Sequence, residues 1–207
     1  MSVDLSKGAT IDLSKAAADA GATAPLSKIM AGAGWDPKQQ GAEVDLDLIG
    51  IKLGADGKAI ADANGNGSNY DEAVNFFRNL KTQGAEHSGD NLTGEGDGDD
   101  ETITYDLNAV EEEVKEIVIV VASYSGTDFS DVDNVKVRMV NADDNSELAA
   151  YTNSDLGSGR AVEVGRVKRE ANGWSFQAVG NVLTVANGKA DAELIKTVLE
   201  NYGVTGL

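Results

Sequence analysis

The sequence predicts an all-β fold, a two-sheet antiparallel β-sandwich with a few short helices. Short runs rich in β-branched residues alternate with clusters of Gly, Asn and Asp, which is typical of strands joined by turns. Residues 134–141 alternate apolar and charged side chains, so one face of that strand is dry. Residues 117–121 are all β-branched without alternation, which indicates a central strand covered on both faces. We therefore expect one domain over residues 1–207.

Seven segments have the length and composition of strands. The expected strands cover residues 43–53, 102–107, 116–124, 134–141, 147–152, 160–170 and 174–181. Apolar residues recur at helical spacing in residues 69–80 and 191–202, which predicts two helices. The second ends at Gly203, a residue type common just after a helix. Residues 16–29 are rich in alanine but interrupted by glycine and proline, so we expect a loop with at most one helical turn.

The chain is strongly acidic, with 35 Asp and Glu residues against 17 Lys and Arg residues and a net charge of −18. That charge repels phosphate backbones and anionic lipid surfaces and attracts small cations, so neither nucleic acid nor a membrane is an expected partner. The sequence has no cysteine, which excludes disulfides, thiolate catalysis and zinc–cysteine sites. A single histidine, His87, is too little for a histidine-based zinc site.

The first residues predict neither export nor membrane insertion. Asp4 stands where a signal peptide carries net positive charge, and no apolar stretch of the required length follows it. The most apolar stretch, residues 117–122, is far shorter than a membrane span. We therefore expect a cytoplasmic protein.

The segment from His87 to Glu101 is the outstanding local feature. From Asp90 to Glu101 it holds six carboxylates, three glycines and no basic residue, so a compact loop needs its like charges neutralised. Calcium meets that need, because it accepts roughly six to eight oxygen ligands in flexible geometry. Leu92 and Gly94 occupy positions where an EF-hand loop has ligands, so this is not an EF-hand. A solvated acidic loop without an ion is the alternative.

Two further aspartates, Asp45 and Asp47, lie two residues apart in the expected strand 43–53. Side chains at this spacing point to the same face of a strand. The pair therefore offers two carboxylates on one surface, and the alternative is that both simply face solvent.

The acidic segment resembles, almost letter for letter from Gly89 to Glu101, the signature of TerD-domain proteins, which are tellurium-resistance and general-stress proteins of bacteria. The resemblance continues in chain order across nearly all of the sequence. Residues 5–9 (LSKGA) are similar to the family's opening strand, 34–36 (GWD) and 45–47 (DLD) to two of its motifs, and 135–140, 147–151 and 173–176 to its later strands.

The resemblance implies a β-sandwich that binds Ca²⁺ in an acidic pocket at one end. The implied metal ligands are Asp45, Asp47, Asp90, Asn91, Asp97, Asp99, Asp100 and Glu101. The sequence departs from the family pattern in two places. The family's DLDAS ends in Leu48-Ile49 here, and its paired asparagines are Arg78-Asn79, which places a cation where an amide ligand is expected.

Other motifs carry weaker signals. Residues 62–67 (DANGNG) fit the first half of a calcium loop, but Ala73 stands where such a loop has its bidentate carboxylate, so we expect an Asx-rich turn. His87 has no Ser or Cys nucleophile motif beside it, so we expect it to be structural or exposed and not a general base. Trp35 and Trp174 are expected in the core.

These observations predict a non-enzymatic calcium-binding protein of the tellurium-resistance and stress-response type that acts as an interaction module for other protein chains. An oligomer or a larger assembly is compatible with the sequence. The alternative is a structural or assembly protein, for example a phage virion component built on a TerD-like fold, which would be located in the virion. A hydrolase with a metal-bound water is a third reading and needs an open coordination position beside a cleft.

Overall fold

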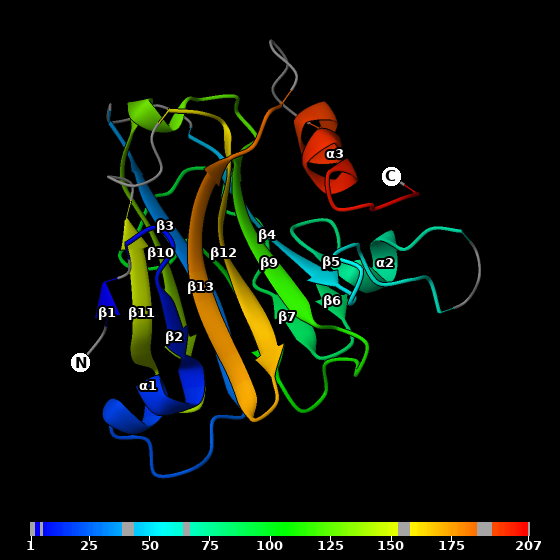
Figure 1. The fold of residues 1–207 in the computed structure, drawn as a ribbon. Helices are drawn as coiled ribbons and strands as arrows, with labels where there is room; N and C mark the ends of the chain where they lie inside the picture. Colours follow the sequence, from blue (N-terminus) through cyan, green and yellow to red (C-terminus); the bar gives the residue numbers. More distant parts are fainter. Residues whose placement is uncertain are drawn as a thin grey trace.

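Two β-sheets pack face to face around the core, with short helices at the periphery (Figure 1). The computed structural model describes residues 3–4, 6–38, 44–63, 67–152, 158–185 and 192–206. The strand order is β1-β11-β10-β3-β8-β7-β6 in the first sheet and β2-β13-β12-β9-β4-β5 in the second. The pairings are antiparallel except for that of β1 with β11. The predicted two-sheet β-sandwich is confirmed.

The described elements have the following bounds. The first sheet contains β1 (Val3–Asp4), β3 (Lys28–Pro37), β6 (Lys81–Thr82), β7 (Ala85–His87), β8 (Glu101–Asp106), β10 (Val132–Asn141) and β11 (Ser146–Thr152). The second contains β2 (Thr10–Asp12), β4 (Leu46–Leu53), β5 (Val74–Asn75), β9 (Glu116–Ser123), β12 (Ala161–Glu170) and β13 (Gly173–Val182). The helices are α1 (Leu13–Asp19), α2 (Tyr70–Ala73), α3 (Ala192–Glu200) and the 3-10 turn η1 (Phe129–Asp131).

Each of the seven predicted strands is present as β4 or β8 to β13, although residue 43, the expected start of the first, lies outside the described residues. β9 lies between β4 and β12, and residues 117–121 are fully buried, as predicted for a central strand. In β10 the valines and the methionine are buried, whereas Lys136 and Arg138 are partly exposed. The alternating pattern therefore identified both the strand and its inner face.

The loop with one helical turn expected over residues 16–29 is present: residues 16–19 complete the helix α1 and residues 20–27 form the loop, whereas residues 28–29 already belong to β3. α1 begins earlier, at Leu13, where the side chain of Asp12 accepts a hydrogen bond of 2.9 Å from the backbone nitrogen of Lys15. Such a cap satisfies one of the free N–H groups of a helix start. The chain turns at Gly21, whose φ of 101° is unfavourable for other residues, and β3 begins at Lys28.

β3 is a strand that the sequence analysis missed. Its sequence includes Ala31, Gly32, Ala33 and Gly34, residue types that are depleted in strands. The strand nevertheless lies in the middle of the first sheet, between β10 and β8. Small residues are required there because the acidic segment packs on them: a Cβ at Gly32 would overlap the carboxylate of Asp99.

The predicted helix over residues 69–80 was wrong beyond its first turn. α2 ends at Ala73, and Val74 and Asn75 then pair with Gly50 and Ile51 of β4. The backbone amides of residues 76 and 79 close a tight turn by bonding to each other's carbonyls. As a strand, residues 74 and 75 provide hydrogen-bond partners for backbone groups at the open edge of β4, which a helix at this place would leave unpaired. This requirement outweighs the helical spacing of the apolar residues.

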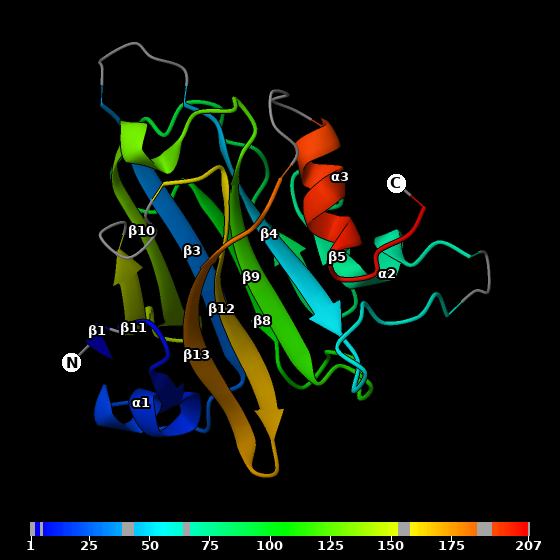
Figure 2. The same ribbon diagram turned by 45° about the horizontal axis from the view of Figure 1, so that its top comes forward.

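The second predicted helix is present as α3, beside β4 and above β5 and α2 (Figure 2). Asp191, its expected first residue, lies outside the described residues. Gly203 follows the helix with a φ of 75°, as expected of a residue after a helix end. The phenolic group of Tyr202 donates to the buried carboxylate of Glu163 at 2.7 Å, which holds this end of the chain on β12.

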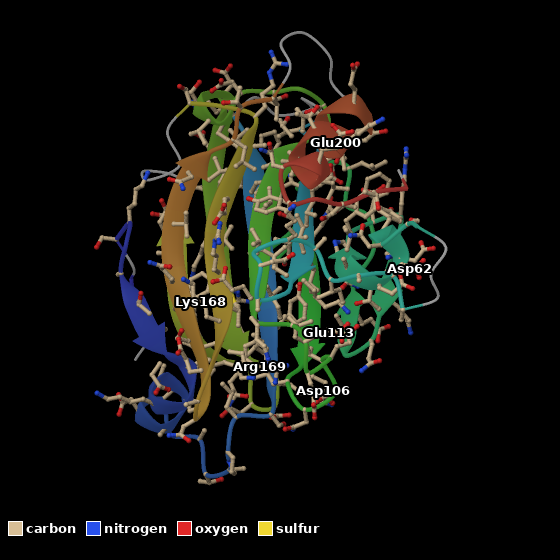
Figure 3. All side chains as sticks on the ribbon, turned by 45° about the vertical axis from the view of Figure 1, so that its right-hand side comes forward. Asp62, Asp106, Glu113, Lys168, Arg169 and Glu200 are labelled. Carbon is tan, nitrogen blue, oxygen red and sulfur yellow. The ribbon has the colours of Figure 1, made fainter. Side chains whose placement is uncertain are left out.

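Both tryptophans are buried, as predicted. The guanidinium of Arg169, near the end of β12 in Figure 3, lies 4.2 Å from the ring centre of Trp174. It also donates to the carbonyls of Val114 and Glu111 at 2.9 and 3.0 Å, which fastens the loop before β9 to the second sheet. Within the described ranges, no helix is long and apolar enough to cross a membrane.

Candidate metal centre

Three carboxylates meet where β4 begins. Asp45 and Asp47 flank the first residue of β4, and Asp90 comes from the start of the acidic segment. One oxygen atom from each of the three lies within 4.8 Å of the others. Asp47 is only 1% exposed and Asp90 is exposed, so the cluster has a buried floor and an open side. Three carboxylate oxygens this close together could hold a hard cation.

The carboxylate of Asp47 has no hydrogen-bond donor on the described part of the chain, and both of its oxygens are buried. Burial and, to a smaller extent, the negative charges of Glu101, Asp45 and Asp90 together raise its pKa to about 9, against the opposing effect of Arg78. Burial and the charges of Asp90 and Glu101 likewise raise the pKa of Asp45 to about 6. The cluster therefore needs protons or a cation at neutral pH.

Glu101 and His87 hold the acidic segment against the open edge of β4. β5 pairs only with residues 50 and 51, so on the side of β4 that faces away from β9 Leu48 has no neighbouring strand. The carboxylate of Glu101 accepts from the Leu48 nitrogen at 2.8 Å, and Nε2 of His87 lies 3.1 Å from the Leu48 oxygen. Both side chains are buried, and together they bind the backbone N–H and C=O of Leu48 as a neighbouring strand would.

The ring orientation of His87 follows from its two contacts. Nδ1 accepts a hydrogen bond of 3.0 Å from the backbone nitrogen of Gly89, so the proton is on Nε2, which faces the carbonyl of Leu48. The histidine is structural, as one of the sequence-based readings expected. Both of its nitrogens are engaged by backbone groups.

Asn91 shapes the turn that follows Asp90. Its side-chain oxygen accepts from the backbone nitrogens of Thr93 and Gly94, each at 3.1 Å, and its side-chain nitrogen donates to Asp100 at 3.0 Å. The backbone nitrogen of Asn91 donates to Glu101 at 3.2 Å. Asn91 therefore ties the beginning of the acidic segment to its end, with its amide oxygen bound to backbone groups.

Asp99 and Asp100 also have protein partners. The carboxylate of Asp99 accepts from Arg138 at 2.7 and 2.8 Å. Asp100 accepts from the backbone nitrogen of Trp35 at 2.9 Å, and burial raises its pKa while that hydrogen bond lowers it. These contacts fasten the second half of the segment to β3 and β10.

Asp97 lies apart from the three clustered aspartates. It is exposed and lines a separate depression of about 320 Å³ together with Asp36, Asp99, Lys136 and Arg138. The predicted ligand set is thus divided. Asp45, Asp47 and Asp90 come together with Glu101 close by, whereas Asp97 and Asp99 lie beside two basic side chains.

Arg78-Asn79 does not present a second amide to the cluster. The side-chain nitrogen of Asn79 donates to the carbonyls of Tyr70, Asp71 and Val74, with the shortest distance, 2.7 Å, to Val74. Among residues 62–67, Asp62 accepts from the Gly67 nitrogen at 3.0 Å, and residues 64–66 lie outside the described residues.

Sequence reasoning did not anticipate that Arg138 binds Asp99 or that the backbone of Leu48 binds Glu101 and His87, because nothing in the local sequence pattern marks these partners.

Comparison with known proteins decides the family. Residues 1–188 match the TerD domain. The chain belongs to the TerD family. It is 36% identical to the tellurium resistance protein TerD of an Alcaligenes species, over 99% of this chain and 98% of that protein. It is 34% identical to the stress response protein SCP2 of Bacillus subtilis, over 87% of this chain and 92% of that protein.

A solved structure shows the same fold. The crystal structure of a homologue of TerD from Streptomyces coelicolor aligns with a TM-score of 0.63, covering 87% of this chain and 99% of that one. The sequence identity is 20%. The β-sandwich is therefore shared at a level of sequence similarity that fixes only the fold.

Proposed function

We propose that this TerD-family chain binds Ca²⁺ at the cluster of Asp45, Asp47 and Asp90. The observation that carries the proposal is the carboxylate of Asp47, buried with both oxygens lacking a hydrogen-bond partner among the described residues. A buried ionised carboxylate without a partner is costly, and proteins keep such groups where a proton or a cation compensates them.

The donor set suits calcium better than other common metals. Three carboxylates are hard oxygen ligands, and neither cysteine nor a second histidine is present in the sequence for a softer ion. Calcium tolerates irregular geometry and accepts backbone carbonyls and water beside carboxylates, whereas magnesium demands a regular octahedron and gives up water reluctantly. When bound, the ion would supply the charge that keeps the three carboxylates ionised together.

The proposed role of the ion is structural. The acidic segment is held at Leu48 by Glu101 and His87, and at β3 and β10 by Asp99 and Asp100. An ion joining Asp90 to Asp45 and Asp47 would add a third attachment of the segment, at Asp90. The segment then presents one fixed surface to another protein chain.

We propose further that the chain is not an enzyme and acts in the cytoplasm as an interaction module. The engagement of both nitrogens of His87 with backbone groups supports this, because the chain's one imidazole is not available as a general base. Relatives named for tellurium resistance and stress response support a role of the same kind for this chain.

The test is a calorimetric titration of chelator-treated protein with calcium and with magnesium, together with melting curves in both ions and in chelator. An ion that binds only the folded state raises the melting temperature by mass action. We expect saturable calcium binding and a higher melting temperature in calcium, with a smaller effect of magnesium. Identical melting curves in chelator and in excess calcium would refute the metal site.

A further inference from the structure

A second cavity lies beside α3, apart from the acidic segment. It has a volume of about 310 Å³, at the lower end of the range for small-molecule sites. It is lined by residues of α2, the turn that follows α2, the residue after β9, α3 and the segment after α3. Figures 1 and 2 show α3 close to α2 and β5. The lining residues are Tyr70, Phe76, Phe77, Arg78, Tyr124, Ile195, Lys196 and Gly206. The last three lie outside residues 1–188, the part that matches the TerD domain.

Aromatic rings form one wall of this cavity. Tyr70 meets Phe76 edge to face at 5.8 Å between ring centres, and Phe76 meets Phe77 at 4.9 Å. Phe77 in turn meets Tyr124 at 5.7 Å, with the ring planes at 88°. Tyr70, Phe77 and Tyr124 remain partly exposed. A flat aromatic ring entering the cavity would find further edge and face positions of the kind that these residues already offer each other.

The charged residues of the cavity are both basic. Arg78 is exposed, lies 5.2 Å from the ring centre of Phe77 and has one hydrogen bond to a described residue, the hydroxyl of Tyr124 at 3.3 Å. A guanidinium has five N–H donors, so most of them remain for a ligand. Lys196 pairs with Glu200 at 3.8 Å, but both side chains are more than half exposed, and such pairs are weak and easily exchanged. Among the described residues, no carboxylate lines the cavity.

We propose that this cavity binds a small aromatic carboxylate of one or two rings. The rings of Tyr70, Phe77 and Tyr124 recognise the flat apolar part, and Arg78 and Lys196 recognise the carboxylate. An arginine and a carboxylate match in geometry, since two parallel N–H groups face two oxygens. The net charge of −18 disfavours the binding of anions to the protein in general. Binding of a carboxylate in this cavity therefore depends on the local positive charges of Arg78 and Lys196. None of the three clustered aspartates lines this cavity, although the charge of Arg78 also acts on Asp47.

The test is an NMR titration of the full chain, followed at the methyl groups of Ile195 and the aromatic signals, in chelator. Benzoate and 2-naphthoate are the probes, with benzamide as the uncharged control and acetate as the control without a ring. We expect saturable shifts with both aromatic acids, binding of benzamide weaker by at least about fivefold, and no saturation with acetate up to about 10 mM. Equal binding of benzoate and benzamide would overturn the proposal.

Matched variants assign the binding to this cavity. Arg78→Gln is expected to weaken benzoate binding by at least about tenfold, and Lys196→Gln by roughly threefold. Lys15→Gln removes the same charge from the exposed face of α1, at the far end of the molecule from α3 (Figure 1), and should leave affinity unchanged. Melting curves confirm that each variant is folded. No saturable shift at Ile195 in wild type, or equal affinities of Arg78→Gln and wild type, would refute the site.

Discussion

The carboxylate of Asp99 packs against Gly32 and forms an ion pair with Arg138. Nε and one terminal nitrogen of Arg138 donate to the two carboxylate oxygens at 2.7 and 2.8 Å. Arg138 and Gly32 are paired residues on the neighbouring strands β10 and β3. The acidic segment is thus fastened to the first sheet by an ion pair within the protein. This relationship sets Asp99, one of the eight residues that the family resemblance implies as ligands, apart from the cluster of Asp45, Asp47 and Asp90, because Asp99 already has a cationic partner within the protein.

The first prediction concerns that ion pair. We expect Asp99→Asn and Arg138→Gln each to destabilise the protein, because a two-pronged charge-assisted contact is lost and the segment loosens. Arg138 is about a third exposed, so the coupling between the two residues is expected to be modest, roughly 1 kcal/mol. Urea denaturation of the two single variants and the double variant measures it. Additive effects of the two substitutions would contradict a direct interaction.

The second prediction separates calcium ligands from other acidic residues. Asp47→Asn, Asp45→Asn and Asp90→Asn should each weaken calcium binding by at least about tenfold, or roughly 1.4 kcal/mol. Asp19→Asn removes the same charge from an exposed position at the end of α1 and should leave calcium affinity nearly unchanged. Titration calorimetry on these variants provides the measurement. A uniform weakening across all four would indicate a diffuse ion atmosphere and no specific site.

The third prediction concerns pH. In chelator, burial and the neighbouring carboxylates raise the pKa of Asp47 in the folded protein from the ordinary aspartate value of 3.8 to about 9, so between these values the folded state holds a proton that the unfolded state releases. Stability in chelator should therefore fall as pH rises between these two values, by up to about 1.4 kcal/mol per pH unit. Below both pKa values the two states are protonated alike and this contribution vanishes.

Asp47→Asn tests the pH prediction, because the amide resembles the protonated acid and does not titrate. Urea denaturation in chelator from about pH 5 to about pH 8 should show a steeper loss of stability for wild type than for the variant. Saturating calcium should remove most of that difference, since the ion takes the place of the proton. Parallel pH profiles of wild type and Asp47→Asn in chelator would contradict the assigned pKa.

Patterns that repeat along a short stretch of sequence predicted most of the fold. The buried run 117–121 and the alternation in 134–141 identified β9 and β10, because burial on two faces and on one face leave different local signatures. The spacing of Asp45 and Asp47 likewise placed two carboxylates on one face, and the structure brings both to Asp90. That meeting was implied by the family resemblance and not by spacing.

Contacts between distant segments account for what the sequence did not predict. Residues 31–34 in the middle of β3 are too small to signal a strand, and the acidic segment packs on two of them, since a Cβ at Gly32 or Gly34 would overlap Asp99 or Gly98. The turn after α2 was read as helix because its apolar spacing is helical, whereas the open edge of β4 decides its conformation. The pairing of Asp99 with Arg138 could likewise not be predicted from the sequence, since no local pattern marks Arg138 as its partner.

The last prediction tests the packing of the acidic segment on β3. Gly32 has an ordinary backbone conformation, so an alanine there meets no backbone strain, but its Cβ would overlap the carboxylate of Asp99. The carboxylate must then move and weaken its bonds to Arg138. We expect Gly32→Ala to cost about 1–3 kcal/mol, as overpacking does elsewhere. Gly54→Ala is the matched control, since its Cβ would have ordinary contacts only and φ is not positive.

If Asp99 is what makes the added methyl costly, removing its charge and its hold on Arg138 should lessen the penalty. Gly32→Ala should therefore cost less in an Asp99→Asn background than in wild type, because the uncharged amide moves aside without giving up an ion pair. Calcium affinity should change little in Gly32→Ala, since Asp45, Asp47 and Asp90 lie elsewhere on the segment and on β4. Urea denaturation and calcium titration of the four variants measure both effects. A stable Gly32→Ala variant, or one as costly without the Asp99 carboxylate as with it, would show that the acidic segment does not rest on β3 in this way.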